Sequence, residues 1–316
     1  MRSSRITRRT FLGAAAGAAA FGAATMDPRL TAAQDYPPGT FVDVHTHISE
    51  GWGTKESLTA KPLLDWMDRS DIAQAVVMPL VSPEAWDHPV STRFVLDETE
   101  NHRDRLIPFC AIDPRTLNLG GYKGFVEVLK RYRDAGAKGF GEHKPGVAID
   151  DPRNMELFRA CADVGLPVLF HLDNNRNWDE PGLPGLANVL EEIPNGIFIG
   201  HAQGWWASIS GDVSKTQLQQ YPNTKVAPGG ALDALMDRFD NIYGDLSAGS
   251  GANAILRDME FGREFVIRRA DRLMFGTDYL APGQQVPQFS LYKELDLPVA
   301  VQEKVFRGNA RTLLGL

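Results

Sequence analysis

Short apolar runs recur along this chain at a nearly constant interval, and this spacing limits the possible folds more than any other feature. Eight runs rich in β-branched and aromatic residues predict strands at 41–47, 72–80, 105–113, 137–144, 167–173, 196–204, 241–249 and 273–279. Their midpoints lie about 30 residues apart, except for a wider gap before the seventh run. This spacing leaves room for a helix between successive strands, which indicates βαβ units and a parallel sheet.

The intervals between the runs carry helical patterns. Apolar residues at helical spacing form one face in 125–132 and another in 157–164. Eight strand–helix units in about 280 residues predict an α/β fold, the (β/α)8 TIM barrel. A doubly wound sheet is the alternative, but it has fewer repeats and usually a glycine-rich first turn, which residues 45–49 lack. The wide interval, 205–240, predicts a long loop with helices inserted after the sixth strand.

The first 33 residues differ from the rest of the chain and predict an export signal. Arginines precede an Ala/Gly-rich stretch, and small residues at 31–33 suit a cleavage site. The run TRRTFL at 7–12 resembles the twin-arginine motif that the bacterial Tat translocase reads. We therefore expect a Tat signal peptide at 1–33, the translocase as its partner, and a periplasmic or secreted protein. A structural helix or membrane anchor is the alternative, which the interrupting glycines disfavour.

The remainder, 34–316, is predicted to form a single acidic domain. The leader carries five Arg and one Asp, so the net charge changes from −7 for the whole chain to −11 for this part. This charge argues against nucleic acid and anionic membranes as partners. No later apolar run reaches the roughly 18 residues of a membrane span, so no membrane anchor is expected in the mature form. Cys110 and Cys161 are too few for a disulfide framework and are expected to be buried.

Polar residues occur in the C-terminal parts of five predicted strands, where barrel active sites lie. They are His45, His47, Glu142, His171, His201 and Asp278. His45 and His47 differ by two positions, so they share one face of their strand. Each histidine alone fits a structural core position. Four of the chain's 7 histidines lie at these strand ends, however, and imidazoles converging with carboxylates predict a first-row metal site.

These residues resemble the amidohydrolase superfamily, specifically its amidohydrolase-related group of metal-dependent hydrolases. The likeness is carried by VDVHTH at 42–47, LFH at 169–171, IGH at 199–201, FGTD at 275–278 and GNARTLLGL at 308–316. It covers nearly all of 41–316 and implies a distorted (β/α)8 barrel. It also implies one or two divalent ions per chain, most commonly zinc, with manganese, iron and nickel also used.

The fourth strand leaves two interpretations open. Glu142 is a candidate bridge between two metals, as in superfamily members with Glu at this position, whereas other members have no ligand on this strand and hold one metal. Lys144 shares a strand face with Glu142, and it either pairs with that carboxylate or meets an anionic substrate. His143 is expected to face the opposite side and to be packed or solvated.

Further side chains are weaker candidates for substrate contacts. Trp205 and Trp206 directly follow His201 and are predicted either to wall the pocket or to pack the inserted loop. Asn174 and Arg176 follow the fifth strand and are candidates to bind a carboxylate or a hydroxyl group. Two other histidines, at 88 and 102, are expected at the surface.

The resemblance implies a hydrolase in which metal-activated water attacks the amide, ester or lactone carbonyl of a small substrate. In that scheme Asp278 is the general base and then the general acid, and His201 orients the substrate or binds a second metal. A metal-dependent non-oxidative decarboxylase of a small carboxylic acid is the alternative, and a periplasmic solute-binding protein is a third possibility. The chain has no Gly-x-Ser-x-Gly elbow and no Walker loop. A homo-oligomer stays open.

Overall fold

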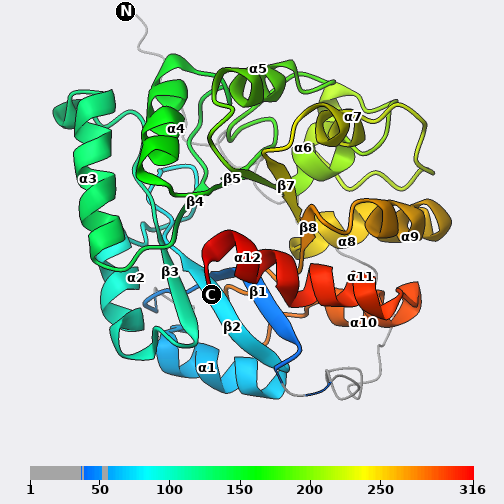
Figure 1. Cartoon of the computed structure of the whole chain (residues 1–316), viewed down its shortest axis with the longest axis horizontal. Coiled ribbons are helices and arrows are strands. Elements are labelled where there is room, and N and C mark those ends of the chain that lie inside the picture. The colour runs from blue at the N-terminus through cyan, green and yellow to red at the C-terminus, as the bar shows by residue number, and fades with distance from the viewer. Residues whose placement is uncertain (1–36, 38, 52–55) are drawn as a thin grey trace, which may run out of the picture. The chain divides into compact units, whose positions relative to one another are not determined.

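The computed structural model describes residues 37, 39–51 and 56–316, and these form a (β/α)8 TIM barrel (Figure 1). The predicted leader, 1–33, lies outside the described residues. The strands are β1 (Phe41–His47), β2 (Ile72–Met78), β3 (Leu106–Cys110), β4 (Gly139–His143), β5 (Val168–His171), β6 (Phe198–His201), β7 (Ile242–Asp245) and β8 (Leu273–Met274). They pair in parallel in sequence order, which confirms the predicted fold class.

The segment after β8 closes the barrel against β1. The Val44 amide donates to the Phe275 carbonyl at 3.0 Å, and the Asp278 amide donates to the His45 carbonyl at 2.8 Å. β8 itself has only two residues, so this following segment does most of the closing. The closure brings the end of the chain's last strand beside the end of its first, which places Asp278 next to His45 and His47.

Helices alternate with the strands around the barrel (Figure 1). They are α1 (Ala60–Arg69), α2 (Thr92–Thr99), α3 (Tyr122–Asp134), α4 (Pro152–Val164), α5 (Pro184–Glu192), α6 (Ala202–Ala207), α7 (Ala231–Arg238), α8 (Ala248–Leu256), α9 (Met259–Arg268), α10 (Gln288–Leu295), α11 (Val299–Glu303) and α12 (Asn309–Leu314). The predicted insertion after the sixth strand is confirmed, because α6, a 3-10 turn (Lys215–Gln219) and α7 all precede β7. No helix in the described ranges is long and apolar enough to cross a membrane.

The ends of α4 show how local sequence sets an element's bounds. Asp151 caps the helix by accepting from the Arg153 amide, and Pro152 occupies the first turn, where its missing N–H costs nothing. Gly165 ends the helix in the left-handed conformation, with φ of 78°. Between these signals the apolar face of α4 is buried in the main apolar core.

The barrel interior is apolar toward one end and polar at the other. Val42, Val44 and Ile199 belong to an inner apolar cluster, which Ala310 and Leu314 of α12 join. The β1–β2 register shifts between Asp43 and Thr46, directly before the strand reaches its histidines. A shift of this kind changes which side chains face the interior. The polar end of the barrel therefore begins where β1 changes register.

The predicted strands after the first all extend past the observed ends, and at two of them the chain turns sharply. The sixth was expected over 196–204, but β6 ends at His201 and α6 begins at once; the seventh was expected over 241–249, but β7 ends at Asp245. The backbone turns sharply at both places, with φ of 82° at Ala202 and 59° at Ala248. Non-glycine residues in this region carry strain that the surrounding structure must hold, and such strain is concentrated at functional sites.

Candidate metal centre

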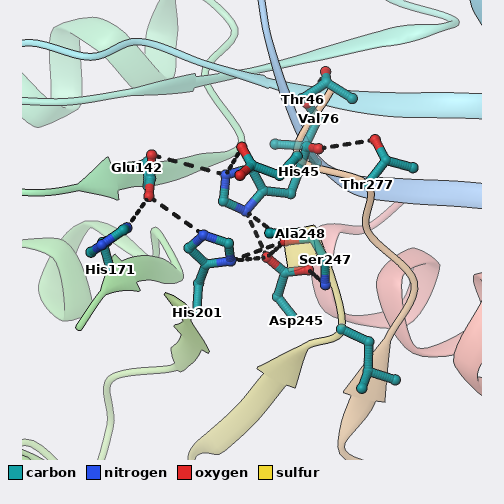
Figure 2. A network of polar contacts seen from close by, with 12 residues as sticks. His45, Thr46, Val76, Glu142, His171, His201, Asp245, Ser247, Ala248 and Thr277 are labelled. Carbon is teal, nitrogen blue, oxygen red and sulfur yellow. Dashed lines mark hydrogen bonds and ion pairs between the residues drawn. The ribbon is translucent and has the colours of Figure 1, made fainter. Parts of the chain in front are cut away.

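The six predicted strand-end residues converge at the polar end of the barrel. His45 and His47 come from β1, Glu142 from β4, His171 from β5, His201 from β6 and Asp278 from the segment after β8. Figure 2 shows Glu142 lying between His45 on one side and His171 and His201 on the other. The side chain of Asp278 is 21% exposed, against 0–6% for the other five, so it is the member that solvent reaches most easily.

His45 and His47 direct unprotonated nitrogens at each other. Nδ1 of His45 lies 2.6 Å from Asp245 Oδ2, and Nδ1 of His47 lies 3.1 Å from the Met78 carbonyl. Both partners are acceptors, so in the neutral rings each Nδ1 carries the proton and each Nε2 carries a lone pair. The two Nε2 atoms nevertheless lie only 3.1 Å apart, and Asp278 Oδ1 lies 3.4 and 3.5 Å from them.

Glu142 faces both halves of the cluster with different oxygens. Oε2 lies 3.5 Å from Nε2 of His47 and 4.0 Å from Nε2 of His45. Oε1 lies 2.8 Å from Nδ1 of His171 and 3.7 Å from Nε2 of His201. This arrangement fits a carboxylate that bridges two ions, and it also fits one ion with Glu142 as a ligand.

The donor set fits a divalent metal. Three overlapping groups each bring three ligand atoms within 4.8 Å of one another, and all three contain His45 or Glu142. The groups are His45, His201 and Asp278; His45, His47 and Glu142; and Glu142, His171 and His201. Buried acceptors that face one another are costly unless a cation lies between them, and imidazole with carboxylate suits first-row metals.

The carboxylates of the cluster are ionised. Burial alone would raise the pKa of Glu142, but the Lys144 ammonium and the bond to His171 hold it well below its usual range. Burial acts likewise on Asp278, yet the neighbouring His45 and the bond to His47 lower its pKa to about 2. Both groups are therefore available as metal ligands, and Asp278 is also available as a base, across the neutral range.

Asp245 is a central member of the site that the sequence analysis missed. This last residue of β7 is fully buried, and its Oδ2 lies 2.6 Å from Nδ1 of His45 and 3.1 Å from Nδ1 of His201. Burial would raise its pKa, but these two histidines lower it below the usual range. The signal was present, since Asp245 is a carboxylate at a strand end. Extending the seventh strand to 249 hid it in the strand interior.

Asp43 is a second buried carboxylate that sequence reasoning passed over. Its Oδ1 accepts from the amides of His45 and Thr277 at 2.9 and 3.0 Å, and its Oδ2 accepts from the Thr277 hydroxyl at 2.6 Å. Burial outweighs these bonds and raises its pKa to about 7. Asp43 thus fastens β1 to the segment that carries Asp278, without contacting a predicted ligand's side chain.

The two cationic candidates lie at the edge of the centre. Lys144 Nζ is 3.1 Å from Glu142 Oε2, and its side chain is 14% exposed. Arg176 lies 3.0 Å from Asp173 Oδ2, which in turn lies 3.0 Å from Nε2 of His171. Lys144 thus pairs with Glu142, which supports the ion-pair interpretation of this lysine. Arg176 pairs with Asp173 and contacts the cluster only through it. A substrate contact of either cation stays a prediction.

Of the two roles predicted for Trp205 and Trp206, the pocket wall is wrong. Trp205 and Trp206 are 0% and 1% exposed and belong to the main apolar core. The ring of Trp205 covers Gly200 so closely that a Cβ there would lie 2.4 Å from it. Trp206 donates its indole N–H to the Asp245 carbonyl at 2.9 Å. Since α6 begins directly after β6, it turns both rings inward, which favours the packing alternative.

The remaining candidates are placed as follows. His143 is buried on the opposite face of β4, as predicted, and bonds to Asn154 at 2.8 Å. Asn174 donates to the Lys215 carbonyl of the insertion at 2.6 Å. The histidines at 88 and 102 are partly exposed. Cys110 and Cys161 are free and buried, which confirms that no disulfide joins them.

A family comparison agrees with this geometry. The Amidohydro_2 family model, described as Amidohydrolase, matches residues 42–316, which include every strand of the barrel. The chain therefore belongs to this amidohydrolase family. No curated protein matches its sequence.

Solved structures of the same fold are distant in sequence. A structure described as a probable 2-pyrone-4,6-dicarboxylic acid hydrolase from Acinetobacter baumannii, with citric acid bound, has a TM-score of 0.58 at 13% identity and covers 88% of this chain and 100% of that one. The 2,6-dihydroxybenzoate decarboxylase from Rhizobium has a TM-score of 0.55 at 18% identity, covering 88% and 99%. A dihydroxybenzoic acid decarboxylase from Polaromonas sp. JS666, with bound manganese, has a TM-score of 0.55 at 15% identity, covering 89% and 98%. At these identities the likeness supports the barrel fold.

Proposed function

We propose that this protein is a metal-dependent hydrolase acting on an amide, ester or lactone carbonyl of a small substrate. The observation that carries the proposal is the pair of Nε2 atoms 3.1 Å apart on β1, each on a ring whose Nδ1 faces an acceptor, with a partly exposed carboxylate beside both. This arrangement combines a cation site with a base that a substrate can reach. We propose zinc as the metal, with manganese, iron or nickel as alternatives, at one or two ions per chain.

The residues divide the work between binding and proton transfer. When bound, a divalent ion lowers the pKa of water toward about 7 and polarises a carbonyl. His45, His47, Glu142, His171, His201 and Asp278 would hold the metal. Asp278 would also take a proton from the attacking water and return it to the leaving group. Lys144 and Arg176 are proposed to bind an anionic part of the substrate.

Metal analysis and isotope labelling test this function. Purified protein should hold about one or two divalent ions per chain, or take up zinc or manganese when these are added. A screen of amides, esters and lactones in ¹⁸O-labelled water should yield a carboxylic product carrying the label. Metal content below about 0.2 per chain with no uptake contradicts the metal site; turnover without label incorporation contradicts hydrolysis.

Non-oxidative decarboxylation is the second candidate. It is favoured by two cations, Lys144 and Arg176, at the edge of the centre, since both suit a substrate carboxylate. The names of two structures with this fold, the decarboxylases from Rhizobium and Polaromonas, point the same way. Release of carbon dioxide from an aromatic hydroxy acid, with no ¹⁸O in the product, would select this reaction over hydrolysis.

Export through the Tat route is also proposed, on the sequence of residues 7–12. Tat carries folded proteins, and a metal site assembled from distant strands exists only in the folded chain. The double variant Arg8→Lys, Arg9→Lys should leave a folded, metal-loaded protein in the cytoplasm. Fractionation of expressing cells measures this. Continued export of the double variant would indicate a general secretory signal instead.

A further inference from the structure

Asp245 contacts two histidines of the metal centre from behind. Its Oδ2 lies 2.6 Å from Nδ1 of His45 and 3.1 Å from Nδ1 of His201, on the side of each ring away from the cluster of ligand atoms. Figure 2 shows Asp245 below His45 and beside His201, with Glu142 on the far side of both rings. A carboxylate oxygen only accepts hydrogen bonds. Ser247 Oγ lies 3.0 Å from Nδ1 of His201, but it donates its own proton to Asp245 Oδ2, so it too can only accept from the ring. Both rings therefore present N–H groups on this side.

We propose that Asp245 is a positioning residue that fixes the tautomers of His45 and His201 together. With Nδ1 protonated on both rings, each Nε2 keeps its lone pair. That of His45 faces His47 and Asp278, while that of His201 faces Glu142 Oε1 at 3.7 Å. The Asp245 carboxylate thus leaves Nε2 of His45 and Nε2 of His201 free to bind a metal, one in each half of the centre. This inference rests on the metal site of the proposed function.

Asp245 is itself held rigidly in place. Its Oδ1 accepts from the Ser247 amide at 2.9 Å, and its Oδ2 accepts from the Ser247 hydroxyl at 2.7 Å. Its backbone carbonyl accepts from Trp206. Gly276 leaves the room that the carboxylate needs, because a Cβ at that position would lie 2.2 Å from Oδ1. The contribution of Trp206 to this site is therefore to anchor the strand end that carries Asp245.

An amide in place of this carboxylate would reverse the tautomer. Asn has one accepting oxygen, whereas Asp245 uses both of its oxygens as acceptors. An Asn NH₂ group facing the rings would force an Nδ1 to accept, and the ring proton would move to Nε2, toward the metal. Carboxylates that orient metal-binding histidines in this way are worth about 10–100-fold in metal affinity.

Asp173 provides a matched control within the same site. It is also buried and accepts from a cluster histidine, His171 Nε2, at 3.0 Å, but it contacts only that one ring. Asp245→Asn and Asp173→Asn each remove one negative charge beside the centre. A purely Coulombic role predicts a loss of zinc affinity in both variants, smaller for Asp173 because Arg176 lies 3.0 Å from it, and no change of ring tautomer at His45 or His201 in either variant. The positioning role predicts a loss of about 100-fold for Asp245→Asn and about 10-fold for Asp173→Asn.

The experiment combines zinc competition with nuclear magnetic resonance. Zinc affinity is measured against a chromogenic chelator, and ¹⁵N-histidine spectra of the metal-free protein are recorded about two pH units above the ordinary histidine pKa. Signals are assigned with His45→Gln and His201→Gln. In the wild type both rings should carry the proton on Nδ1. Asp245→Asn should shift at least one of them to Nε2, and Asp173→Asn should shift neither.

Gly276→Ala separates position from charge. It retains the carboxylate but displaces it, so it should weaken zinc binding and alter the same two ring signals. Circular dichroism of the metal-free variants identifies any that do not fold, and either Asp245→Asn or Gly276→Ala is sufficient for the test. Wild-type zinc affinity and unchanged ring signals in a folded variant overturn the inference. A wild type that binds no zinc overturns the proposed function instead, while the ring signals still report on Asp245.

Discussion

Glu142 and His143 are neighbours on β4, yet they point to opposite faces of the strand and join two very different buried clusters. Glu142 belongs to the candidate metal centre, where Nε2 of His45 and Nε2 of His47 lie 3.1 Å apart and the latter lies 3.5 Å from a Glu142 oxygen. His143 belongs to a cluster with Asn154 and Asn177. Both clusters are buried and polar, so burial and polarity alone do not distinguish them.

The difference lies in how donors and acceptors are matched. His143 Nε2 donates to Asn154 Oδ1 at 2.8 Å, Asn154 donates to Asn177 at 3.0 Å, and Asn177 donates back to the His143 carbonyl at 2.6 Å. Every contact in this asparagine cluster pairs a donor with an acceptor, which makes it a stabilising network. The metal centre has acceptors in excess. Unmatched acceptors, and not buried histidines as such, therefore distinguish the face of β4 that carries the candidate metal centre.

The largest expected effect comes from removing a histidine on the metal side. His45→Ala should lose bound metal and activity together, because it removes the ligand shared by two of the three donor groups. A catalytic metal supplies several kcal/mol of transition-state stabilisation, so activity should fall by about 10³-fold or more. Elemental analysis and turnover measure the two losses. His143→Ala is the matched control, and if it lost metal equally, the contrast between the two faces would be wrong.

The next effect concerns the base of the centre. Asp278→Asn should keep the fold and much of the metal, since the five other candidate ligands remain, but it removes the proton acceptor. Loss of a general base costs about 10²–10⁴ in rate. The measurement is kcat on an identified substrate, alongside metal content. Near-normal turnover of this variant would remove Asp278 from the proposed mechanism.

On the other face of β4 the expected loss is in stability. Asn154→Ala removes the hydrogen-bond partner of His143 Nε2 and of Asn177 Oδ1. The free energy of unfolding should therefore fall by about 3 kcal/mol. Metal content should not change. Urea unfolding measures the effect, and Asn174→Ala, which removes one bond from a partly exposed residue, is the control with a loss below about 1 kcal/mol. Equal losses in the two variants would show that the asparagine cluster is not a special source of stability.

The fold was predictable because it depends on a repeated pattern. Eight apolar runs at a steady spacing have few solutions other than a barrel, and the first strand was predicted to the residue. The ends of the sixth and seventh strands were not predictable. Residues after His201 and Asp245 stay small or apolar, like a continuing strand. The turn there depends on positive φ angles at Ala202 and Ala248, which only tertiary contacts make tolerable.

The site was predictable as far as it depended on strand ends. Six polar residues at those ends were expected to meet, and in the structure their ligand atoms do meet. The contacts behind the ligands were not predictable in the same way. Asp245 was hidden by an overlong strand. For Trp206 a pocket role and a packing role stayed open, because its place on an inward-facing helix depends on where β6 ends. Supporting residues are thus lost first when an element's boundary is misplaced.

The effect that is smallest near neutral pH is the contribution of His143, in the asparagine cluster, to the pH dependence of stability. Burial lowers the pKa of His143 from 6.5 to about 4, and the bond to Asn154 only partly offsets this. Below pH 6.5, His143 therefore becomes protonated in the unfolded chain, while it stays neutral in the folded chain down to about pH 4. Stability should fall as the pH drops from about 6.5 to about 4, by at most about 3 kcal/mol.

His143→Gln isolates this effect, because Gln still donates a hydrogen bond to Asn154 but does not titrate. Because other groups also contribute to the pH dependence of unfolding, the quantity to compare is the difference in unfolding free energy between wild type and variant at each pH. The wild type loses stability through His143 as the pH falls, and the variant does not. The free energy of unfolding of the variant should therefore rise steadily relative to that of the wild type below pH 6.5. A difference that stays constant from pH 7 down to about 4.5 would mean that His143 titrates alike in the folded and unfolded chains. The description of His143 as a neutral histidine within a fully hydrogen-bonded cluster on this face of β4 would then be incorrect.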